Sequence, residues 1–195
     1  MAEDAVAAYF ARSAEALGRA AADPNVLATT RAIADAVTDA LRAGGKVLVA
    51  GNGGSAADAQ HIAGELLSRF VRRRQPLAAI ALTDPAVLTG IGNDYGFEHV
   101  FERQVRGLGR RGDVFLALST SGRSPNVLAA LRAARAAGLT TIGCTGAHGS
   151  ALRELCDLCL TAPSEETAVI QQIYMIAAHA ICAHVERELG TADAG

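Results

Sequence analysis

The sequence predicts an α/β fold, a three-layer sandwich in which a five-stranded parallel sheet lies between layers of helices. Five short apolar runs of five or six residues are spaced along residues 46–162. Segments with helical periodicity separate most of these runs, which is the pattern of consecutive β-α-β units. The runs are continuously apolar rather than alternating, as expected for strands that are buried on both faces of a parallel sheet.

The N-terminal segment, residues 1–43, is predicted to form two helices that precede the sheet. Residues 3–43 are rich in Ala, with Leu, Ile and Val at mixed spacings of three and four, and Asp23-Pro24-Asn25 interrupts this pattern. Residues 44–190 supply the α/β core, so residues 1–195 form a single domain with a helical N-terminal extension. The Ala-rich faces of this extension are suited to close packing against a partner chain.

The core contains five predicted strands and four predicted helical regions. The strands are residues 46–50, 77–82, 114–119, 140–145 and 158–162. The helical regions are residues 55–70, 85–108, 124–137 and 165–189. In the third helical region Ser124 precedes Pro125 as an N-cap, and Gly138 stands where a left-handed C-cap is expected.

The composition argues against nucleic-acid and membrane binding. The 18 Lys and Arg residues are balanced by 20 Asp and Glu residues, so the chain has no overall basic field for a polyphosphate. Trp, which commonly stacks on unpaired bases, is absent. The N-terminus has no basic leader, and we expect every apolar stretch to be shorter than the roughly 18 residues of a membrane span. The expected location is cytoplasmic, and the four cysteines are expected to be bystanders.

Two loops that follow predicted strands are rich in groups that bind phosphate. Gly51-Asn-Gly-Gly-Ser55 follows the first strand, and its glycines permit a close approach of the backbone to a ligand. Ser119-Thr-Ser-Gly-Arg-Ser124 follows the third strand and carries four hydroxyl groups. Both loops open a helix at the carboxyl edge of the sheet, where anions bind. Either loop alone could be a tight turn with an N-cap, but two equivalent loops favour a small phosphorylated ligand.

A candidate acid, base and metal cluster follows the first loop. His61 and Glu65 are four residues apart and share one face of a helix, although a solvated charged face is the common alternative. The last helix carries Gln171, Gln172 and His179 in an apolar segment, where a lone His is more often a core residue. Gln171 and His179 are separated by about 12 Å along a helix axis, which is long for two ligands of one ion. We therefore expect a neighbouring chain to complete the site.

Four segments together resemble the phosphoheptose isomerases of the sugar isomerase (SIS) domain family. In chain order they read GNGGSAADAQHIAGEL, GNDYGFEHVF, GDVFLALSTSGRSPNV and VIQQIYMIAAH. The resemblance covers nearly the whole chain and implies a five-stranded parallel sheet between helices, assembled as a homotetramer with intersubunit active sites. It also implies an aldose–ketose isomerase that converts sedoheptulose 7-phosphate to D-glycero-D-manno-heptose 7-phosphate through an enediol.

The resemblance further implies a role for each matching residue. Glu65 would be the proton-transferring base and His179 its acid–base partner. The residues that would bind the sugar phosphate are Asn52, Gly53, Gly54, Ser55, His61, Glu65, Asn93, Asp94, Ser119, Thr120, Ser121, Ser124 and Gln171. One zinc ion per active site would be held by His61, Glu65, Gln171 and His179. Because a zinc-bound carboxylate is a weakened base, either Glu65 leaves the metal during turnover or the ion chiefly positions and polarises oxygens.

Several alternatives stay open at the level of sequence. Many family members carry an acid three residues before the glutamine, where this chain has Ala168, so the fit of the substrate is in question. Gln172 competes with Gln171, since its spacing of seven residues to His179 is angularly closer on a helix. The rival functions are a non-catalytic SIS-domain regulator that binds sugar phosphates, a replication-initiator-associating protein, and another phosphosugar isomerase. The presence of both Glu65 and His179 favours an enzyme.

Overall fold

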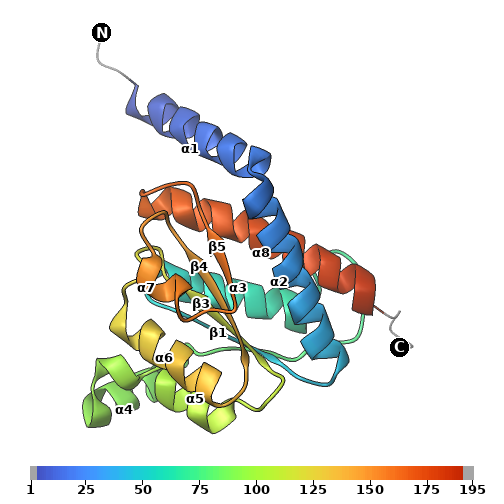
Figure 1. The fold of residues 1–195 in the computed structure, drawn as a ribbon, viewed down its shortest axis with the longest axis vertical. Coiled ribbons are helices and arrows are strands. Elements are labelled where there is room, and N and C mark those ends of the chain that lie inside the picture. Colours follow the sequence, from blue (N-terminus) through green and yellow to red (C-terminus); the bar gives the residue numbers. More distant parts are fainter. Residues whose placement is uncertain (1–3, 191–195) are drawn as a thin grey trace.

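The computed structural model, which describes residues 4–190, contains one five-stranded parallel sheet with helices on both faces (Figure 1). The strand order is β2-β1-β3-β4-β5. The strands are β1 (Val47–Gly51), β2 (Ala79–Ala81), β3 (Val114–Leu118), β4 (Thr140–Thr145) and β5 (Leu158–Thr161). The predicted three-layer sandwich with a five-stranded parallel sheet is therefore confirmed.

The helices divide between the two faces of the sheet. The first layer contains α2 (Pro24–Arg42), α3 (Gly54–Leu67) and α8 (Thr167–Leu189), on which α1 (Ala5–Ala22) also packs. The second layer contains α4 (Pro85–Tyr95), a 3-10 turn η1 (Phe97–His99), α5 (Glu102–Leu108), α6 (Pro125–Ala136) and α7 (Ser150–Arg153). The first layer thus carries both helices that hold the candidate acid and base.

Successive residues of each central strand enter opposite hydrophobic cores. In β1, Val47 and Val49 pack with the first layer, whereas Leu48 and Ala50 pack with the second. All four side chains are at most 1% exposed. Burial on both faces explains why the strand sequence is apolar without alternation.

The prediction of one continuous helical region over residues 85–108 is wrong, because the chain is interrupted after α4. Gly96 has φ +94°, a conformation that side chains rarely adopt, and it ends α4. The chain then forms η1 and the short helix α5. The short helix α7 was also not predicted, whereas the left-handed C-cap expected at Gly138 is present with φ +77°.

Helix α8 corrects the expectation that every apolar stretch is short. Its 23 residues include an 18-residue window with a mean hydropathy of 1.4, so length and composition alone would allow a membrane span. Half of that window is buried inside the protein. Ile170, Ile173 and Tyr174 are at most 3% exposed and belong to the first core. The helix therefore serves as a core helix of the sandwich, which explains its apolar sequence.

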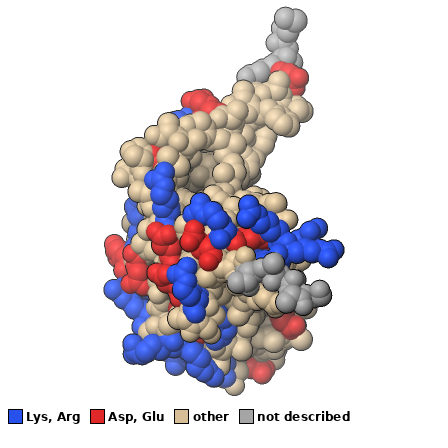
Figure 2. Space-filling model, turned by 90° about the vertical axis from the view of Figure 1, so that its right-hand side faces the viewer, with Lys and Arg blue, Asp and Glu red and all other residues tan. Residues whose placement is uncertain are grey.

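Helix α1 projects from the body of the molecule (Figure 1). Only Ser13, Ala16 and Ala20 of this helix are buried, while Val6 and Phe10 are 67% and 71% exposed. On the face drawn in Figure 2 the arm is largely uncharged, and acidic and basic side chains are interspersed over the body below it. The arm thus presents apolar side chains to its surroundings.

Candidate active site

The two candidate phosphate loops lie side by side at the carboxyl edge of the sheet. Strands β1 and β3 are neighbours, and Gly51 pairs in register with Leu118, so the chain leaves both strands at the same level. Asn52 of the first loop and Asn126 in the first turn of α6, directly after the second loop, form reciprocal side-chain hydrogen bonds. Asn52 Nδ2 donates to Asn126 Oδ1 at 2.9 Å, and Asn126 Nδ2 donates back to Asn52 Oδ1 at 2.8 Å. This pair fixes the loops relative to each other.

The helices that follow these loops start without a side-chain cap. Gly53 (φ +55°) is the N-cap of α3 and has no side chain. Ser124 is the N-cap of α6, as predicted, but its hydroxyl makes no capping hydrogen bond. Ser124 Oγ lies 3.2 Å from Ser119 Oγ instead. The N–H groups at both helix starts are partly used within the protein. In α3 Ser55 N donates to Asn52 O at 3.0 Å, and in α6, where Pro125 has no N–H, Val127 N donates to Asn126 Oδ1 at 2.9 Å.

A cavity of about 210 Å³ adjoins the second loop. Its lining includes Thr120, Ser121 and Arg123 from the loop and His148 and Glu165 from the opposite side. His148 Nε2 lies 2.6 Å from Glu165 Oε1, so this pair forms part of the cavity wall. The cavity offers hydroxyl groups and a guanidinium group to an anion of modest size.

A hydrogen-bond chain connects the first loop to helix α8. Gln171 Nε2 donates to Ser55 Oγ at 3.4 Å, Ser55 Oγ lies 2.8 Å from Tyr174 Oη, and Tyr174 Oη donates to Asp58 Oδ2 at 2.8 Å. Burial raises the pKa of Tyr174 above its usual range, and the neighbouring Asp58 adds to this effect, so the phenol stays protonated as a donor. A Cβ at Gly54 would lie 2.7 Å from Gln171 Nε2, so a larger residue there would push this amide away from its present position.

His61, Glu65 and His179 converge from two helices. One ligand atom of each residue lies within 4.8 Å of those of the other two. His61 Nε2 is 3.1 Å from Glu65 Oε1, and His179 Nε2 is 3.4 Å from His61 Nε2. The side chains of His61 and Glu65 are 48% and 22% exposed, so solvent and a ligand can reach them. Two imidazoles and a carboxylate at this separation can exchange protons with a ligand or hold a cation.

The remaining predicted residues lie outside this cluster. Gln171 contacts the first loop, whereas Gln172 Nε2 donates to Tyr9 Oη at 3.3 Å and so joins α8 to α1. Asn93 and Asp94 are exposed on α4, and Asn93 Nδ2 donates to Asp94 Oδ1 at 2.8 Å. Of the two glutamines, Gln171 is the one that faces the candidate site.

Comparisons with known proteins identify the family. The SIS domain model matches residues 8–146. The phosphoheptose isomerase of Bradyrhizobium sp. strain BTAi1 is 58% identical over 189 residues, which cover 96% of each chain. The chain belongs to the phosphoheptose isomerase family.

Solved structures from the phosphoheptose isomerase family have the same fold. The enzyme of Neisseria gonorrhoeae is 41% identical, with a TM-score of 0.88 over 96% of this chain and 100% of its own. The enzyme of Francisella tularensis is 38% identical, with a TM-score of 0.89 over 96% of this chain and 99% of its own. The fold of these relatives therefore matches nearly the whole chain, including the segments whose motifs resemble the family.

Two residues at the site of this phosphoheptose isomerase family member escaped sequence reasoning. Tyr174 reads as one apolar residue of α8, although its position three residues after Gln171 places both on neighbouring parts of the helix surface. Asn126 follows Ser124-Pro125 and reads as an ordinary first-turn residue, yet it is 2% exposed and bonded to the first loop. In both cases the signal was a polar group at a position that becomes buried.

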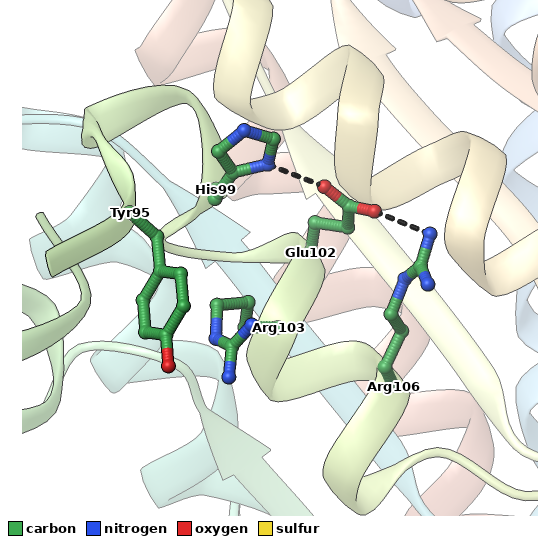
Figure 3. Close-up of a pocket in the computed structure, with 5 residues that line it drawn as sticks. All are labelled: Tyr95, His99, Glu102, Arg103 and Arg106. Carbon is green, nitrogen blue, oxygen red and sulfur yellow. Dashed lines mark hydrogen bonds and ion pairs between the residues drawn. The ribbon is translucent and has the colours of Figure 1, made fainter.

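A second pocket in this family member, of about 270 Å³, lies over α4, η1 and α5 (Figure 3). His99 Nδ1 lies 2.7 Å from Glu102 Oε2, Arg106 Nη2 lies 2.6 Å from Glu102 Oε1, and the Arg103 guanidinium lies 3.6 Å from the centre of the Tyr95 ring. The His99 hydrogen bond is the main cause that lowers the pKa of Glu102. The charged groups of this pocket are thus paired with neighbouring side chains, whereas α3 and α6 start without a side-chain cap at the sheet edge.

Proposed function

We propose that this chain is an aldose–ketose isomerase that interconverts sedoheptulose 7-phosphate and D-glycero-D-manno-heptose 7-phosphate. The observation that carries the proposal is the convergence of Glu65 and His179 from α3 and α8, with His61 of α3 beside them. A carboxylate and an imidazole at one site can move protons on carbon and on oxygen, respectively. The family membership supplies the substrate.

The phosphate group is assigned to the second loop. Ser119, Thr120, Ser121 and Ser124 would donate their hydroxyls together with the Asn126 N–H at the start of α6, because hydroxyl and amide donors suit a terminal phosphate monoester. The first loop, with Asn52, Gly53, Gly54 and Ser55, would line the sugar. Gln171 would contact the same part of the sugar, since its amide lies against Gly54 and Ser55. Asn93 and Asp94 remain proposed substrate contacts.

The proton transfers are assigned to the two facing side chains. Moving the carbonyl from the second carbon of the ketose to the first requires removal of a proton from the first carbon, an enediol, and return of a proton to the second carbon. Glu65 would carry the carbon-bound proton in both directions. His179 would move the proton between the two oxygens, because an imidazole titrates near neutral pH.

The cluster also fits a zinc ion by its donor set. Two imidazoles and one carboxylate are ligands that catalytic Zn²⁺ sites use, with a further position for substrate or water. His61, Glu65 and His179 would hold the ion. Gln171 is the proposed fourth ligand and would have to turn toward the cluster from its present contact with Gly54 and Ser55. A bound zinc ion would polarise the sugar oxygens as a Lewis acid.

We propose a homotetramer with active sites between subunits. An apolar groove of about 260 Å³ lies between α1, α2 and α8, and its lining includes Leu17, Leu27, Ile173 and Ile176. Ile176 is 54% exposed, and the apolar arm α1 borders the same groove. Burial of such surface drives association of identical chains. The proposed enzyme acts in the cytoplasm on a small sugar phosphate, without nucleic-acid or membrane partners.

The test is a proton-NMR assay of the purified, zinc-loaded protein. Sedoheptulose 7-phosphate is the first substrate, and fructose 6-phosphate and ribulose 5-phosphate are the comparison substrates. We expect anomeric signals of the aldose with the heptulose only. Turnover of a comparison substrate with none of the heptulose would indicate another phosphosugar isomerase. Binding without turnover of any of the three would replace this proposal with a non-catalytic sugar-phosphate-binding protein.

A further inference from the structure

Two oppositely charged side chains are buried next to the proton-transfer cluster. Arg74 lies in the loop that follows α3, the helix of Glu65. Glu186 lies near the end of α8, the helix of His179. Their side chains are 1% and 4% exposed, and Arg74 Nε lies 3.5 Å from Glu186 Oε2. A charged pair at this depth is costly to desolvate unless further hydrogen bonds complete it.

The Glu186 carboxylate accepts three successive backbone N–H groups from the loop after α3. Phe70 N donates to Glu186 Oε2 at 2.9 Å, while Val71 N and Arg72 N donate to Oε1 at 2.9 and 2.7 Å. Burial raises the pKa of Glu186, but these N–H groups and the Arg74 charge outweigh it, so the pKa lies below its usual range. One ionised side chain of α8 therefore fixes the backbone of this loop.

The Arg74 guanidinium holds the last turn of α3. Its Nη2 donates to the backbone oxygen of Glu65 at 2.8 Å, and its Nη1 donates to the oxygen of Leu66 at 2.8 Å and of Gln75 at 3.0 Å. The final carbonyls of a helix have no partner inside the helix, so these bonds replace the missing ones. The residue held in this way is the proposed base itself.

Phe70 connects the loop held by Glu186 to His179, the proposed acid–base partner of Glu65. Its ring stacks on the His179 imidazole, with centroids 5.6 Å apart and planes inclined by 27°. The N–H of the same residue is bonded to Glu186, so the carboxylate sets where the ring lies. The other face of the cluster is formed by His61, whose ring centroid lies 5.1 Å from that of His179.

We infer that Phe70, Arg74 and Glu186 are positioning residues of the active site, which together hold Glu65 and His179 at their working separation. This inference rests on the proposed function and deepens it. None of the three is assigned to contact substrate or to transfer a proton. Their effect on rate follows from geometry, because a displacement of about 1 Å at reacting groups can reduce the rate by about 10²-fold.

The matched control for Glu186→Gln is Asp113→Asn at the amino edge of the sheet. Asp113 is also buried, accepts the backbone N–H groups of Lys46 and Arg110, and pairs with the Lys46 ammonium. Both substitutions remove a buried carboxylate charge, so both are expected to lower the melting temperature. Only Glu186 is connected to Phe70 and His179.

The experiment combines NMR of histidine-ring-labelled, metal-free protein with steady-state kinetics of the zinc-loaded protein. The His179 resonances are assigned with His179→Gln. Removing the anchor of the ring in Glu186→Gln should shift the His179 ring-proton signals. Phe70→Leu shifts them in any case, because the ring current is lost, so that variant is judged by kcat. The same variants should lower kcat roughly tenfold or more, with KM within about twofold, because the phosphate loops are untouched. Phe70→Tyr should restore both readouts, and Asp113→Asn should change neither.

Each outcome decides the inference. If Glu186→Gln keeps the His179 signals of the wild type, and both Glu186→Gln and Phe70→Leu keep its kcat while losing stability, these residues are structural only and the inference is wrong. If Glu186→Gln does not fold, the kcat values of Phe70→Leu and Phe70→Tyr decide. A loss in the first that is absent from the second supports the inference, and a wild-type kcat in both contradicts it. If the wild-type protein shows no turnover, the proposed function fails, and the His179 signals in Glu186→Gln still report whether this carboxylate positions the imidazole.

Discussion

Helices α3 and α6, which begin at the candidate loops, differ from three helices that begin elsewhere with a side-chain cap; α5, α7 and α8 also start without one. Helices α1, α2 and α4 start after Asp4, Asp23 and Asp84, and each carboxylate accepts a backbone N–H of the first turn at 2.8–3.2 Å. Helices α3 and α6 start at Gly53 and Ser124 without such a bond. A carboxylate N-cap adds stability to a helix start, whereas a helix start whose N-cap side chain makes no such bond leaves more of its N–H groups to an anionic ligand.

The same contrast applies to carboxylates. Asp113, at the amino edge of the sheet, is fully engaged by Lys46 and Arg110. Glu65, in the cluster beside α8, has a 22% exposed side chain and one close side-chain neighbour, His61. Substitutions at satisfied groups should therefore change stability, and substitutions at available groups should change binding or turnover.

The largest effect is expected for Glu65→Gln. Glutamine keeps the size of the side chain but cannot accept a proton at neutral pH, so kcat should fall by at least about 10²-fold with the melting temperature nearly unchanged. Turnover by NMR and thermal unfolding measure the two quantities. Glu154→Gln, at an exposed glutamate after α7, is the control and should leave both unchanged. Near-normal kcat in Glu65→Gln would contradict the assignment of the base.

Removing a helix cap should give the next effect, on stability. Asp23→Ala removes the acceptor of the Asn25 N–H at the start of α2, which should cost about 0.5–2 kcal/mol of unfolding free energy. Urea denaturation measures this cost. The KM for sedoheptulose 7-phosphate should stay at the wild-type value, because α2 begins away from the loops.

Ser124→Ala should show the converse pattern with a smaller free energy. The Ser124 hydroxyl does not cap α6, so the unfolding free energy should hardly change. Loss of one hydroxyl donor to the phosphate should weaken substrate binding by about 0.5–1.5 kcal/mol, or roughly two- to thirteenfold. Calorimetry with sedoheptulose 7-phosphate and Glu65→Gln as the inactive background measures the affinity. A loss of stability with unchanged affinity would reverse the comparison between Ser124 and Asp23.

The last effect is a change in stability that appears only in acid. Burial raises the pKa of Asp113, but the hydrogen bonds from Lys46 and Arg110 outweigh it and the pKa lies below its usual range. A lowered folded-state pKa contributes stability above the unfolded value near about 4, and this contribution is lost as the pH falls through the folded-state pKa. The difference in unfolding free energy between wild type and Asp113→Asn should therefore shrink below about pH 4. A difference that grows on acidification would contradict this sign.

The sequence predicted those features that depend on local pattern. The apolar runs located the five strands, and the two loops and the His61 and Glu65 pair were recognised from spacing alone. The break at Gly96 was missed because Gly is also tolerated inside helices, and its positive φ is set by the tertiary fold. Ser124 was predicted to cap α6. The sequence cannot show whether the hydroxyl of a serine at this position bonds to the helix or stays free, and here it makes no capping bond.

The features that the sequence did not predict depend on contacts between residues far apart in the chain. The bonds from Glu186 to residues 70–72 span more than one hundred positions, and no local pattern links them. Likewise, Tyr174 and Asn126 become site residues only when the sheet brings α8 and α6 to the first loop. The orientation of Gln171 and Gln172 was decided by the neighbours of α8, which are the first loop on one side and Tyr9 of α1 on the other.

The central claim is that this site moves a carbon-bound proton through an enediol. The most direct measurement is turnover of sedoheptulose 7-phosphate in heavy water, followed by NMR and mass analysis of the product and the recovered substrate. We expect solvent deuterium at the second carbon of the aldose and, after reversal, at the first carbon of the ketose, with both signals lost in Glu65→Gln. Complete retention of protium in both sugars after many turnovers would contradict the enediol route and the role of Glu65.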